Sequence, residues 1–352
     1  MYLKHKSTLT FAAAAVAAAM VAGPASAMMD VAKHYKDKTV TILIGYGPGG
    51  TYDQYAQTMA RNLGKHIPGK PNVIVQHMPG AGGAKAMNYA YNVVPKEGHN
   101  LVMPLDNIVV NQLLRPERMR YQSNKFTWLG SSNQTNIVVV ARSDSGVTDI
   151  KSWKGRSLIG STSGKNSNGY LAPKMVMETL GLKGKIVTGY KGSRKSILAI
   201  EQGESQMAGF NWLAWNSIVP QWFKSEGGKP QFARPIVQIG HFPDPDIQGV
   251  PRLGDLVEAK YKKAVAFLAS SGPLGRGLAA PPGVSKDVIA ALRKAYDGMN
   301  ADKAYEAALK KRGLRLLPTD GATLQGLVDK AMNDTTPEVI QQVRTLIFGG
   351  KS

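Results

Sequence analysis

Short apolar segments alternate with longer amphipathic segments along the chain. Residues 39–46 and 72–77 are rich in β-branched and apolar side chains, which predicts strands, whereas residues 53–67 carry large apolar side chains at the four-residue spacing of a helix face. Further strands are predicted at residues 100–105, 137–141, 157–160, 186–188 and 206–210, and further helices at residues 84–94, 168–180 and 193–202. Both halves therefore repeat a strand, a small-residue turn and a helix, and this order predicts an α/β fold.

The last part of the chain is predicted to be helical. Ser285 is in position to cap a helix whose apolar stripe begins at Val288. Thr336 and Pro337 form a cap and first-position pair for a final helix that extends to Ile347.

The N-terminus has the three parts of a secretory signal peptide. Lys4 and Lys6 give it a basic start, residues 9–22 are apolar, and residues 25–27 match the small-residue cleavage motif. The apolar stretch is too short to span a bilayer easily, although an uncleaved anchor is the alternative. We therefore expect cleavage after Ala27 and export to the periplasm.

Length, cysteine content and charge narrow the class of protein. Removal of residues 1–27 from the 352 leaves 325, more than one hydrophobic core usually supports, so two lobes are expected. The chain has no cysteine, which excludes disulfides, thiolate metal sites and a lipid-anchored N-terminus. The formal charge of +20 falls to +18 without Lys4 and Lys6, and so basic a protein attracts anions. The basic residues are scattered and no nucleic-acid motif occurs, so a solvated surface is favoured over a polyanion site.

A glycine-rich segment at residues 45–50 follows the first predicted strand and precedes a helix. It matches G-x-G-x-x-G, the fingerprint of dinucleotide-binding proteins. However, the second predicted strand ends in Gln76 and His77, with no acidic residue to hold a ribose hydroxyl. This absence and the predicted export both count against a dinucleotide site.

Other catalytic and metal motifs are weaker. Residues 64–70 fit the phosphate-binding pattern G-x-x-x-x-G-K, but Pro71 stands at the Ser/Thr position and the segment follows a helix. Residues 160–164 lack the central Ser of a nucleophile elbow. The histidines show no metal-ligand spacing, and nothing marks an acid–base pair. We therefore predict no catalytic residue, no metal and no cofactor.

Four turns rich in small residues indicate a binding site for an anion. A helix start leaves backbone N–H groups unpaired, its dipole favours negative charge, and glycine lets the backbone come close to a ligand. Each helix start contributes about 0.3–1 kcal/mol at exposed sites. Micromolar binding requires roughly 8 kcal/mol, so several turns must converge on one ligand. The candidate turns are residues 47–53, 79–83, 161–167 and 189–193, and ordinary tight turns are the alternative.

Six short motifs also occur in the order typical of one known family. They are YGPGGTYD at residues 46–53, PGAGG at 79–83, PKEGHNL at 95–101, GYKG at 189–192, VPRL at 250–253 and GLAAPPG at 277–283. Together they resemble the Bug-type substrate-binding proteins of tripartite tricarboxylate transporters, over nearly the whole mature chain. The resemblance implies a two-lobed Venus-flytrap fold of the type II periplasmic binding proteins, with small carboxylates bound between the lobes. It also implies delivery of the ligand to a membrane permease of one large and one small subunit.

The resemblance and the four turns together give the expected site. The resemblance supplies the first-lobe residues of the two glycine loops and the second-lobe turn at residues 162–167. The ligand-binding residues that we expect are Tyr46, Gly49, Gly50, Asp53, Gly80, Ala81, Gly82, Gly83, Ser161, Thr162, Ser163, Gly164, Lys165, Ser167, Tyr190, Lys191 and Asn211.

The sequence departs from the family pattern at several of these loops. Asn166 replaces the usual glycine of the second-lobe turn, with Lys165 beside it. Gln57 stands where an arginine is expected, Gln206 where an acidic residue is expected, and Ala84 where an asparagine often follows PGAGG. The chain therefore resembles a divergent branch, and the ligand of better-known members does not transfer.

Several side chains have two interpretations. Asp53 either caps its helix or accepts a hydrogen bond from a ligand or water. Lys165 and Lys191 either pair with a second carboxylate or are solvated. Trp212 and Trp215 form either an aromatic wall for a ring-bearing acid or part of the core.

We therefore expect a monomeric periplasmic receptor that closes around a small di-, tri- or aromatic carboxylic acid and then contacts its permease. A sensor subunit for a membrane kinase and an enzyme on the same fold are the alternatives. The expected domain limits are residues 28–138 for the first lobe and 139–265 for the second. Residues 266–352 are expected to return to the first lobe and to supply the C-terminal helices.

Overall fold

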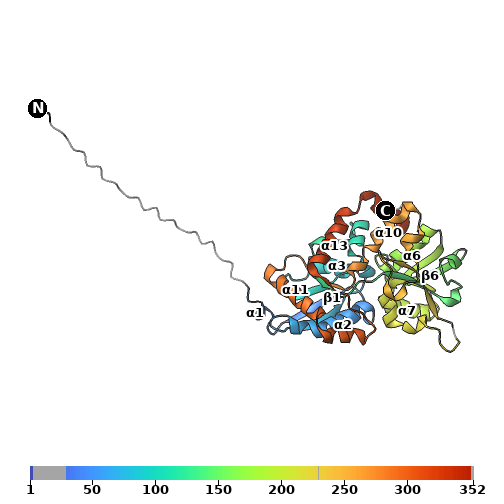
Figure 1. Ribbon diagram of the computed structural model, residues 1–352, viewed down its shortest axis with the longest axis horizontal. Coiled ribbons are helices and arrows are strands. Elements are labelled where there is room, and N and C mark those ends of the chain that lie inside the picture. The colour runs from blue at the N-terminus through green and yellow to red at the C-terminus, as the bar shows by residue number, and fades with distance from the viewer. Residues whose placement is uncertain (3–28, 229, 350–352) are drawn as a thin grey trace.

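The computed structural model describes residues 1–2, 29–228 and 230–349, and Figure 1 shows them as two groups of strands and helices that lie side by side. The predicted signal peptide, apart from Met1 and Tyr2, lies outside the described residues. Within the described ranges, every helix is too short or too polar to cross a membrane.

The first lobe is built on a six-stranded mixed sheet with the order β11-β4-β10-β3-β1-β2. Its parallel strands are β1, β2 and β3, and β10 runs antiparallel to both β3 and β4. The strands are β1 (Thr39–Ile44), β2 (Asn72–His77), β3 (Asn100–Met103), β4 (Thr127–Ser131), β10 (Gly277–Ala280) and β11 (Thr319–Asp320). The helices of this part of the chain are α1 (Val31–Tyr35), α2 (Thr51–Leu63), α3 (Ala84–Asn92), α4 (Ile108–Leu114), α11 (Lys286–Asn300), α12 (Lys303–Lys310) and α13 (Gly321–Asp334).

The second lobe is built on a five-stranded sheet with the order β7-β6-β8-β5-β9. Strands β7, β6 and β8 are parallel, and β5 runs antiparallel to its neighbours β8 and β9. The strands are β5 (Ile137–Arg142), β6 (Ser157–Thr162), β7 (Lys183–Thr188), β8 (Met207–Asn211) and β9 (Ala233–Ile239). The helices around it are α5 (Ile150–Trp153), α6 (Asn168–Leu180), α7 (Ser193–Glu201), α8 (Trp212–Ile218), α9 (Leu253–Leu256), α10 (Lys262–Ala269) and the last helix, α14 (Pro337–Phe348).

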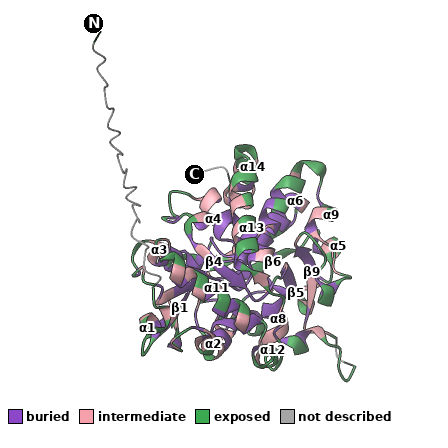
Figure 2. Ribbon diagram, turned by 60° about the vertical axis from the view of Figure 1, so that its left-hand side comes forward, coloured by how far each residue is buried: buried purple, intermediate pink, exposed green. Residues whose placement is uncertain are grey.

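Each sheet has a hydrophobic core on both of its faces. In β1, Ile42 and Ile44 pack into one core and Leu43 into the other, because successive strand side chains point to opposite faces. In β5, Val139 and Val138 likewise pack into different cores on opposite faces of the second sheet. Burial on both faces explains why these strands are continuously apolar in sequence. Figure 2 shows the buried strands inside and the exposed residues on the outer sides of the helices.

Most predicted elements occur close to their predicted positions. Strand β2 and helix α6 have the predicted bounds, and the expected side-chain caps at Ser285 and Thr336 begin α11 and α14. Strands β4 and β9 were not predicted, and two short strands, β10 and β11, interrupt the part that was expected to be helical. Strand β10 is only four residues of Gly, Leu and Ala, too short for a periodic signal, and its pairing with β3 and β4 defines it.

Candidate functional site

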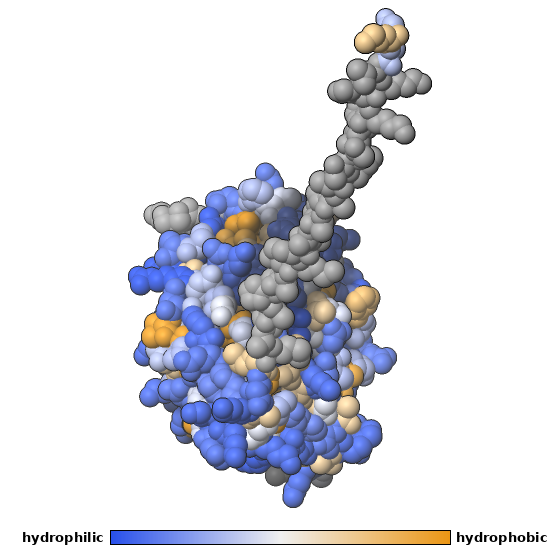
Figure 3. Space-filling model, turned by 90° about the vertical axis from the view of Figure 1, so that its left-hand side faces the viewer, coloured by the Kyte–Doolittle hydropathy of each residue, from blue (hydrophilic) through white to orange (hydrophobic). Residues whose placement is uncertain are grey.

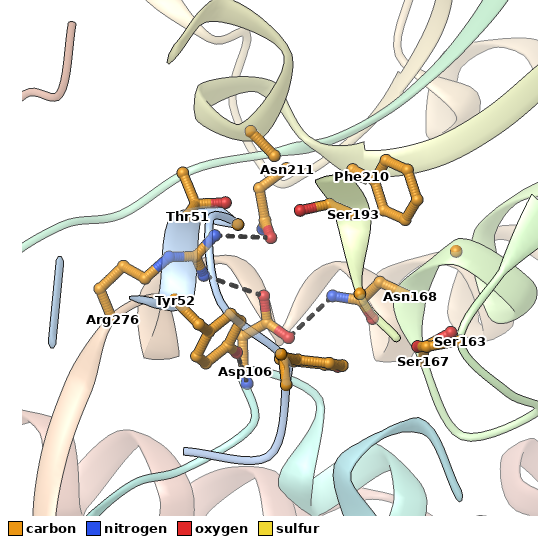
Figure 4. Close-up of a pocket in the computed structure, with 16 residues that line it drawn as sticks. Thr51, Tyr52, Asp106, Ser163, Ser167, Asn168, Ser193, Phe210, Asn211 and Arg276 are labelled. Atoms are coloured by element: carbon orange, nitrogen blue, oxygen red, sulfur yellow. Dashed lines mark hydrogen bonds and ion pairs between the residues drawn. The ribbon is translucent and has the colours of Figure 1, made fainter. Parts of the chain in front are cut away.

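A cavity of about 40 Å³ lies between the two lobes. That volume admits only a few water-sized groups, so this conformation accommodates a small ligand. The first lobe supplies Tyr46, Tyr52, Asp106 and Arg276 to its wall, with the backbone around Gly50, and the second lobe supplies serine, asparagine and phenylalanine side chains. Figure 4 shows Tyr52, Asp106 and Arg276 of the first lobe close to Asn168, Phe210 and Asn211 of the second. We refer to this cavity as the inter-lobe pocket.

Three helices of nine or more residues begin at the wall of the inter-lobe pocket, in addition to the seven-residue α8, whose N-cap is Asn211. The N-cap residues Gly50 of α2, Ser167 of α6 and Gly192 of α7 all line it. Among the described residues, none of the three helix starts has a side-chain cap, so their backbone N–H groups remain available. The positive ends of the three helix dipoles therefore favour an anion in the pocket.

Arg276 is the one cationic side chain of the inter-lobe pocket among the described residues, and it is only 1% exposed. Its guanidinium lies 4.2 Å from the ring centroid of Tyr52, and its Nη2 donates to Asn211 Oδ1 at 3.2 Å. Arg276 Nε and Nη1 have no hydrogen-bond partner within the described part of the chain. Arg276 also has a positive φ of 56°, which costs energy for a residue with a Cβ. A strained backbone that holds two free buried donors is a feature of functional sites.

Asp106 faces Arg276 across the pocket wall and is 2% exposed. Its Oδ1 accepts from the Asn107 backbone N–H at 2.9 Å and from Asn168 Nδ2 at 2.8 Å. Its Oδ2 lies 3.7 Å from Arg276 Nη1, beyond hydrogen-bond distance, and has no other partner in the described ranges. Burial raises the pKa of Asp106, and the nearby Arg276 charge opposes that shift.

Two tyrosines complete the first-lobe wall. Burial raises the pKa of both Tyr46 and Tyr52 well above the ordinary value, so both hydroxyls stay protonated at neutral pH. The Tyr52 hydroxyl accepts from the Asp106 backbone N–H at 2.8 Å and so positions that residue. Their rings lie 4.9 Å apart and, with Phe210, give the pocket its apolar surface.

The two lobes contact each other closely around the pocket. The Gly47 N–H donates to the Lys191 carbonyl at 3.0 Å, and a Cβ on Gly47 would lie 2.8 Å from that oxygen. A Cβ on Gly82 would likewise lie 2.8 Å from the Ser167 nitrogen in the opposite lobe. At these positions glycine allows close approach of backbone to backbone.

Asn166 makes four hydrogen bonds between the lobes. Its carbonyl accepts from Asn107 Nδ2 and Asn111 Nδ2, each at 2.8 Å. Its side chain accepts from Arg115 Nη1 at 3.0 Å and donates to the Ala81 carbonyl at 3.0 Å. All four bonds join the second-lobe turn to the first lobe, so Asn166 holds the lobes together.

The structure brings together five of the residues expected to bind the ligand. The expected residues that line the inter-lobe pocket are Tyr46, Gly50, Ser163, Ser167 and Asn211. Three of the four candidate turns, at residues 47–53, 161–167 and 189–193, contribute to this wall, and the start of α8 takes the place of residues 79–83.

The other first-lobe candidates lie away from the pocket wall. Gly49 and Asp53 line an outer groove of about 510 Å³, where Asp53 accepts from the Gly49 N–H at 2.8 Å and lies 2.8 Å from His77 Nε2. Asp53 therefore fixes the first glycine loop. The remaining residues of this group form the second glycine loop against Asn166 and Ser167: Gly80, Ala81, Gly82 and Gly83.

The other second-lobe candidates make internal or solvent contacts. Ser161 Oγ donates to the Ser196 carbonyl, Thr162 Oγ1 lies 2.6 Å from Ser167 Oγ, and the Gly164 carbonyl accepts from Ser167. Lys165 and Lys191 are exposed, and the Tyr190 hydroxyl donates to Glu204. Contact of these residues with a ligand stays a prediction.

Sequence reasoning missed the charged pair of the pocket. Arg276 immediately precedes the GLAAPPG motif, and Asp106 immediately follows the predicted strand at residues 100–105, so both lie beside recognised signals. Trp212 and Trp215 are buried in the core of the second lobe. Phe210 belongs to the same core cluster and also lines the inter-lobe pocket. Within the described residues, no group of three or more His, Asp or Glu side chains could hold a metal ion.

The two-lobed α/β fold with a pocket between the lobes is that of periplasmic solute-binding proteins. BugD is 17% identical, with a TM-score of 0.69 over 89% of this chain and 98% of its own. MatC from Rhodopseudomonas palustris, solved with malate, is 17% identical, with a TM-score of 0.67 over 87% and 99%. Rpa4515 from the same organism, solved with adipate, is 18% identical, with a TM-score of 0.67 over 87% and 97%. The resemblance to Bug-type proteins is thus confirmed at the level of the fold.

Residues 127–317 match the family described as "ABC transporter, phosphonate, periplasmic substrate-binding protein", and the chain belongs to this family. No curated protein matches the sequence. The predicted class, a periplasmic substrate-binding protein, is therefore confirmed.

Proposed function

We propose that this protein captures a small carboxylate in the inter-lobe pocket and delivers it to a two-subunit membrane permease of the tripartite tricarboxylate type. The observation that carries the proposal is the buried Arg276 guanidinium, whose Nε and Nη1 make no hydrogen bond within the described part of the chain. A guanidinium binds a carboxylate through two parallel N–H···O bonds. The start of α2, α6 and α7 at the same wall adds further positive potential.

The ligands of the structural relatives support a carboxylate. MatC and Rpa4515 were solved with malate and adipate, which are both dicarboxylates, and their folds cover most of this chain. In the proposed mode one carboxylate pairs with Arg276 and the helix starts, and the cavity of about 40 Å³ limits the rest of the molecule to a few atoms unless the lobes open.

A phosphonate is the second candidate, because the family description names phosphonate. A phosphonate dianion would bring two negative charges against one guanidinium, and the Asp106 carboxyl lies beside that guanidinium. The uncompensated charge would be buried, which is costly. We therefore favour the monoanionic head of a carboxylate over a phosphonate.

The proposed cycle involves export, closure and release. Cleavage after Ala27 would release the mature protein as a monomer into the periplasm, and the lobes would close by a hinge motion. We keep the predicted lobe limits, residues 28–138, 139–265 and 266–352, as part of the proposal, with two adjustments. Strand β5 of the second sheet begins at Ile137, and α14, within the last segment, packs mainly against α6 and α10 of the second lobe instead of returning to the first. The protein would bind its ligand without reaction, and a permease gene beside its own gene would favour transport over a sensing role.

Isothermal titration calorimetry and thermal shift test the proposal with a panel of mono-, di-, tri- and aromatic carboxylates, methylphosphonate and inorganic phosphate. At least one carboxylate should bind the wild type at micromolar concentration, and Arg276→Gln should weaken it about 100-fold, because charge-assisted hydrogen bonds contribute about 1.5–3 kcal/mol each. Arg118→Gln, which removes an arginine that is 65% exposed, is the matched control and should bind normally. If methylphosphonate raised the melting temperature and none of the carboxylates did, the carboxylate proposal would be wrong and the phosphonate would be the ligand class.

A further inference from the structure

The inter-lobe pocket contains hydrogen-bond acceptors and donors that make no hydrogen bond within the described residues. For the two amide side chains of the pocket, the hydrogen bonds that they do make determine which atom is the oxygen and which is the nitrogen. Asn168 must turn its Nδ2 toward Asp106, because a carboxylate only accepts, so its Oδ1 faces elsewhere. Asn211 must turn its Oδ1 toward Arg276, because a guanidinium only donates, so its Nδ2 is the free atom. Both amides are more than nine-tenths buried.

Four side chains of the pocket therefore present two kinds of atom that make no hydrogen bond within the described residues, and two of these atoms, Arg276 Nη1 and Asp106 Oδ2, face each other as an ion pair at 3.7 Å. The donors are Arg276 Nε and Nη1 and Asn211 Nδ2. The acceptors are Asp106 Oδ2 and Asn168 Oδ1. Figure 4 shows Asp106 between the Arg276 guanidinium and the Asn168 amide, so the acceptor side is next to the donor side.

A plain carboxylate satisfies only half of this arrangement. It would pair with the donors of Arg276 and Asn211 and would leave Asp106 Oδ2 buried without a partner. An unpaired buried carboxylate oxygen is costly, and its cost rises when the Arg276 charge is taken up by the ligand. A ligand that also carries a hydrogen-bond donor satisfies both sides.

We infer that the natural ligand bears an ammonium or hydroxyl group on the carbon next to the carboxylate that Arg276 binds. Asp106 Oδ2 lies only 3.7 Å from Arg276 Nη1, so the two ligand groups must be close neighbours in the molecule. An α-amino acid fits best, because its two charges match those of Arg276 and Asp106, and an α-hydroxy acid fits next. The rings of Tyr46, Tyr52 and Phe210 then surround the rest of a small ligand. This inference rests on the proposed function and narrows its ligand class.

Asp106 is the specificity-determining residue in this arrangement, and Asn168 assists it. Asp106→Asn keeps the shape of the side chain but removes its charge, so it should lower the affinity for α-amino and α-hydroxy acids without weakening the unsubstituted acids. Asn168→Ala should do the same to a smaller extent. Asp255→Asn, at a carboxylate that is 57% exposed and pairs with Arg252, is the matched control.

Calorimetry on the purified protein tests the inference with two matched series: L-alanine, L-lactate and propionate, and L-aspartate, L-malate and succinate. In at least one series the substituted acids should bind wild type about tenfold or more tightly than the unsubstituted acid, as expected when a buried polar group loses its partner. Asp106→Asn should reduce that ratio toward one, and Asp255→Asn should preserve it.

The outcomes separate this inference from the proposed function. Equal binding of all three acids in every series that binds, or a ratio that Asp106→Asn leaves unchanged, overturns the inference and leaves carboxylate capture intact. Failure of every acid in both series and in the wider carboxylate panel overturns the proposed function as well. If Asp106→Asn does not fold, as judged by its circular dichroism and melting curve, the wild-type ratio and its change in Asn168→Ala decide the question.

Discussion

The two walls of the inter-lobe pocket differ in their chemistry. The first lobe contributes both charged side chains, Arg276 and Asp106, whereas the second-lobe wall, within the described residues, consists of neutral serine, asparagine, glycine, alanine and phenylalanine residues. The charged wall has fixed geometry, because Tyr52 contacts both charged residues. The neutral wall has the starts of α6, α7 and α8 and short polar side chains. The comparison suggests that the first lobe selects the ligand by charge and that the second lobe covers it.

The exposed surface and the inter-lobe pocket also differ in how their positive charge is arranged. Figure 3 shows one face of the molecule on which hydrophilic residues predominate and hydrophobic residues form separate small groups. The high positive charge of the chain is therefore compatible with a solvated exterior, while at the pocket, within the described residues, a single buried arginine provides the positive charge. The exposed basic residues can raise the local concentration of an anionic ligand, but salt screens them.

The strongest test of the charged wall is Arg276→Lys. Lysine keeps the positive charge but loses the planar pair of donors, so carboxylate affinity should fall about 10- to 100-fold. Calorimetry with the tightest-binding acid of the panel measures the change. Arg118→Lys should leave the dissociation constant unchanged. An Arg276→Lys protein with wild-type affinity would show that the guanidinium geometry is not used.

The contact between the walls is tested by Asn166→Ala. The change removes two hydrogen bonds across the lobes, each contributing about 0.5–1.5 kcal/mol, so the closed state and the ligand affinity should weaken by about tenfold. The radius of gyration of the ligand-free protein, measured by small-angle X-ray scattering, should increase. Asn62→Ala, whose side chain bonds within the first lobe, should change neither quantity. An unchanged radius and affinity would mean that Asn166 does not control closure.

The neutral wall should contribute less per residue. Ser163→Ala removes one hydroxyl at the pocket and should weaken carboxylate binding about 2- to 10-fold, as expected for one neutral hydrogen bond. Ser145→Ala, at a hydroxyl that bonds the Arg142 carbonyl far from the pocket, provides the comparison for calorimetry. A loss as large as that of Arg276→Lys would contradict the proposed division between the walls.

The smallest effect is expected for Lys165→Gln. Lys165 is exposed at the rim of the second-lobe turn, so its loss should lower affinity no more than about twofold, and only at low salt. Titrations at about 20 mM and 500 mM sodium chloride separate this long-range effect from direct contact. A salt-independent tenfold loss would restore Lys165 as a ligand-binding residue in a more closed conformation.

Much of the fold follows from local sequence. The continuous apolar strands, the four-residue spacing in α2 and the caps of α11 and α14 are short-range features, and the structure has them where the sequence predicts them. The turns at residues 47–53, 161–167 and 189–193 could also be predicted from the sequence, because small residues that follow a strand and precede a helix indicate a helix start at a sheet edge. Their contribution to one pocket agrees with the expectation that several turns must converge.

The charged pair of the pocket depended on tertiary structure. Asp106 follows β3 and Arg276 precedes β10, and because these strands are antiparallel neighbours, the end of one meets the start of the other at the same sheet edge. That pairing joins residues far apart in sequence, and β10 is too short to be recognised from its own residues. The sequence by itself therefore determined the α/β plan, the helix starts and the resemblance to a transport family. Only the packing of the sheet and the closure of the lobes decided which side chains face the ligand, because burial and pairing depend on neighbours that no local pattern specifies.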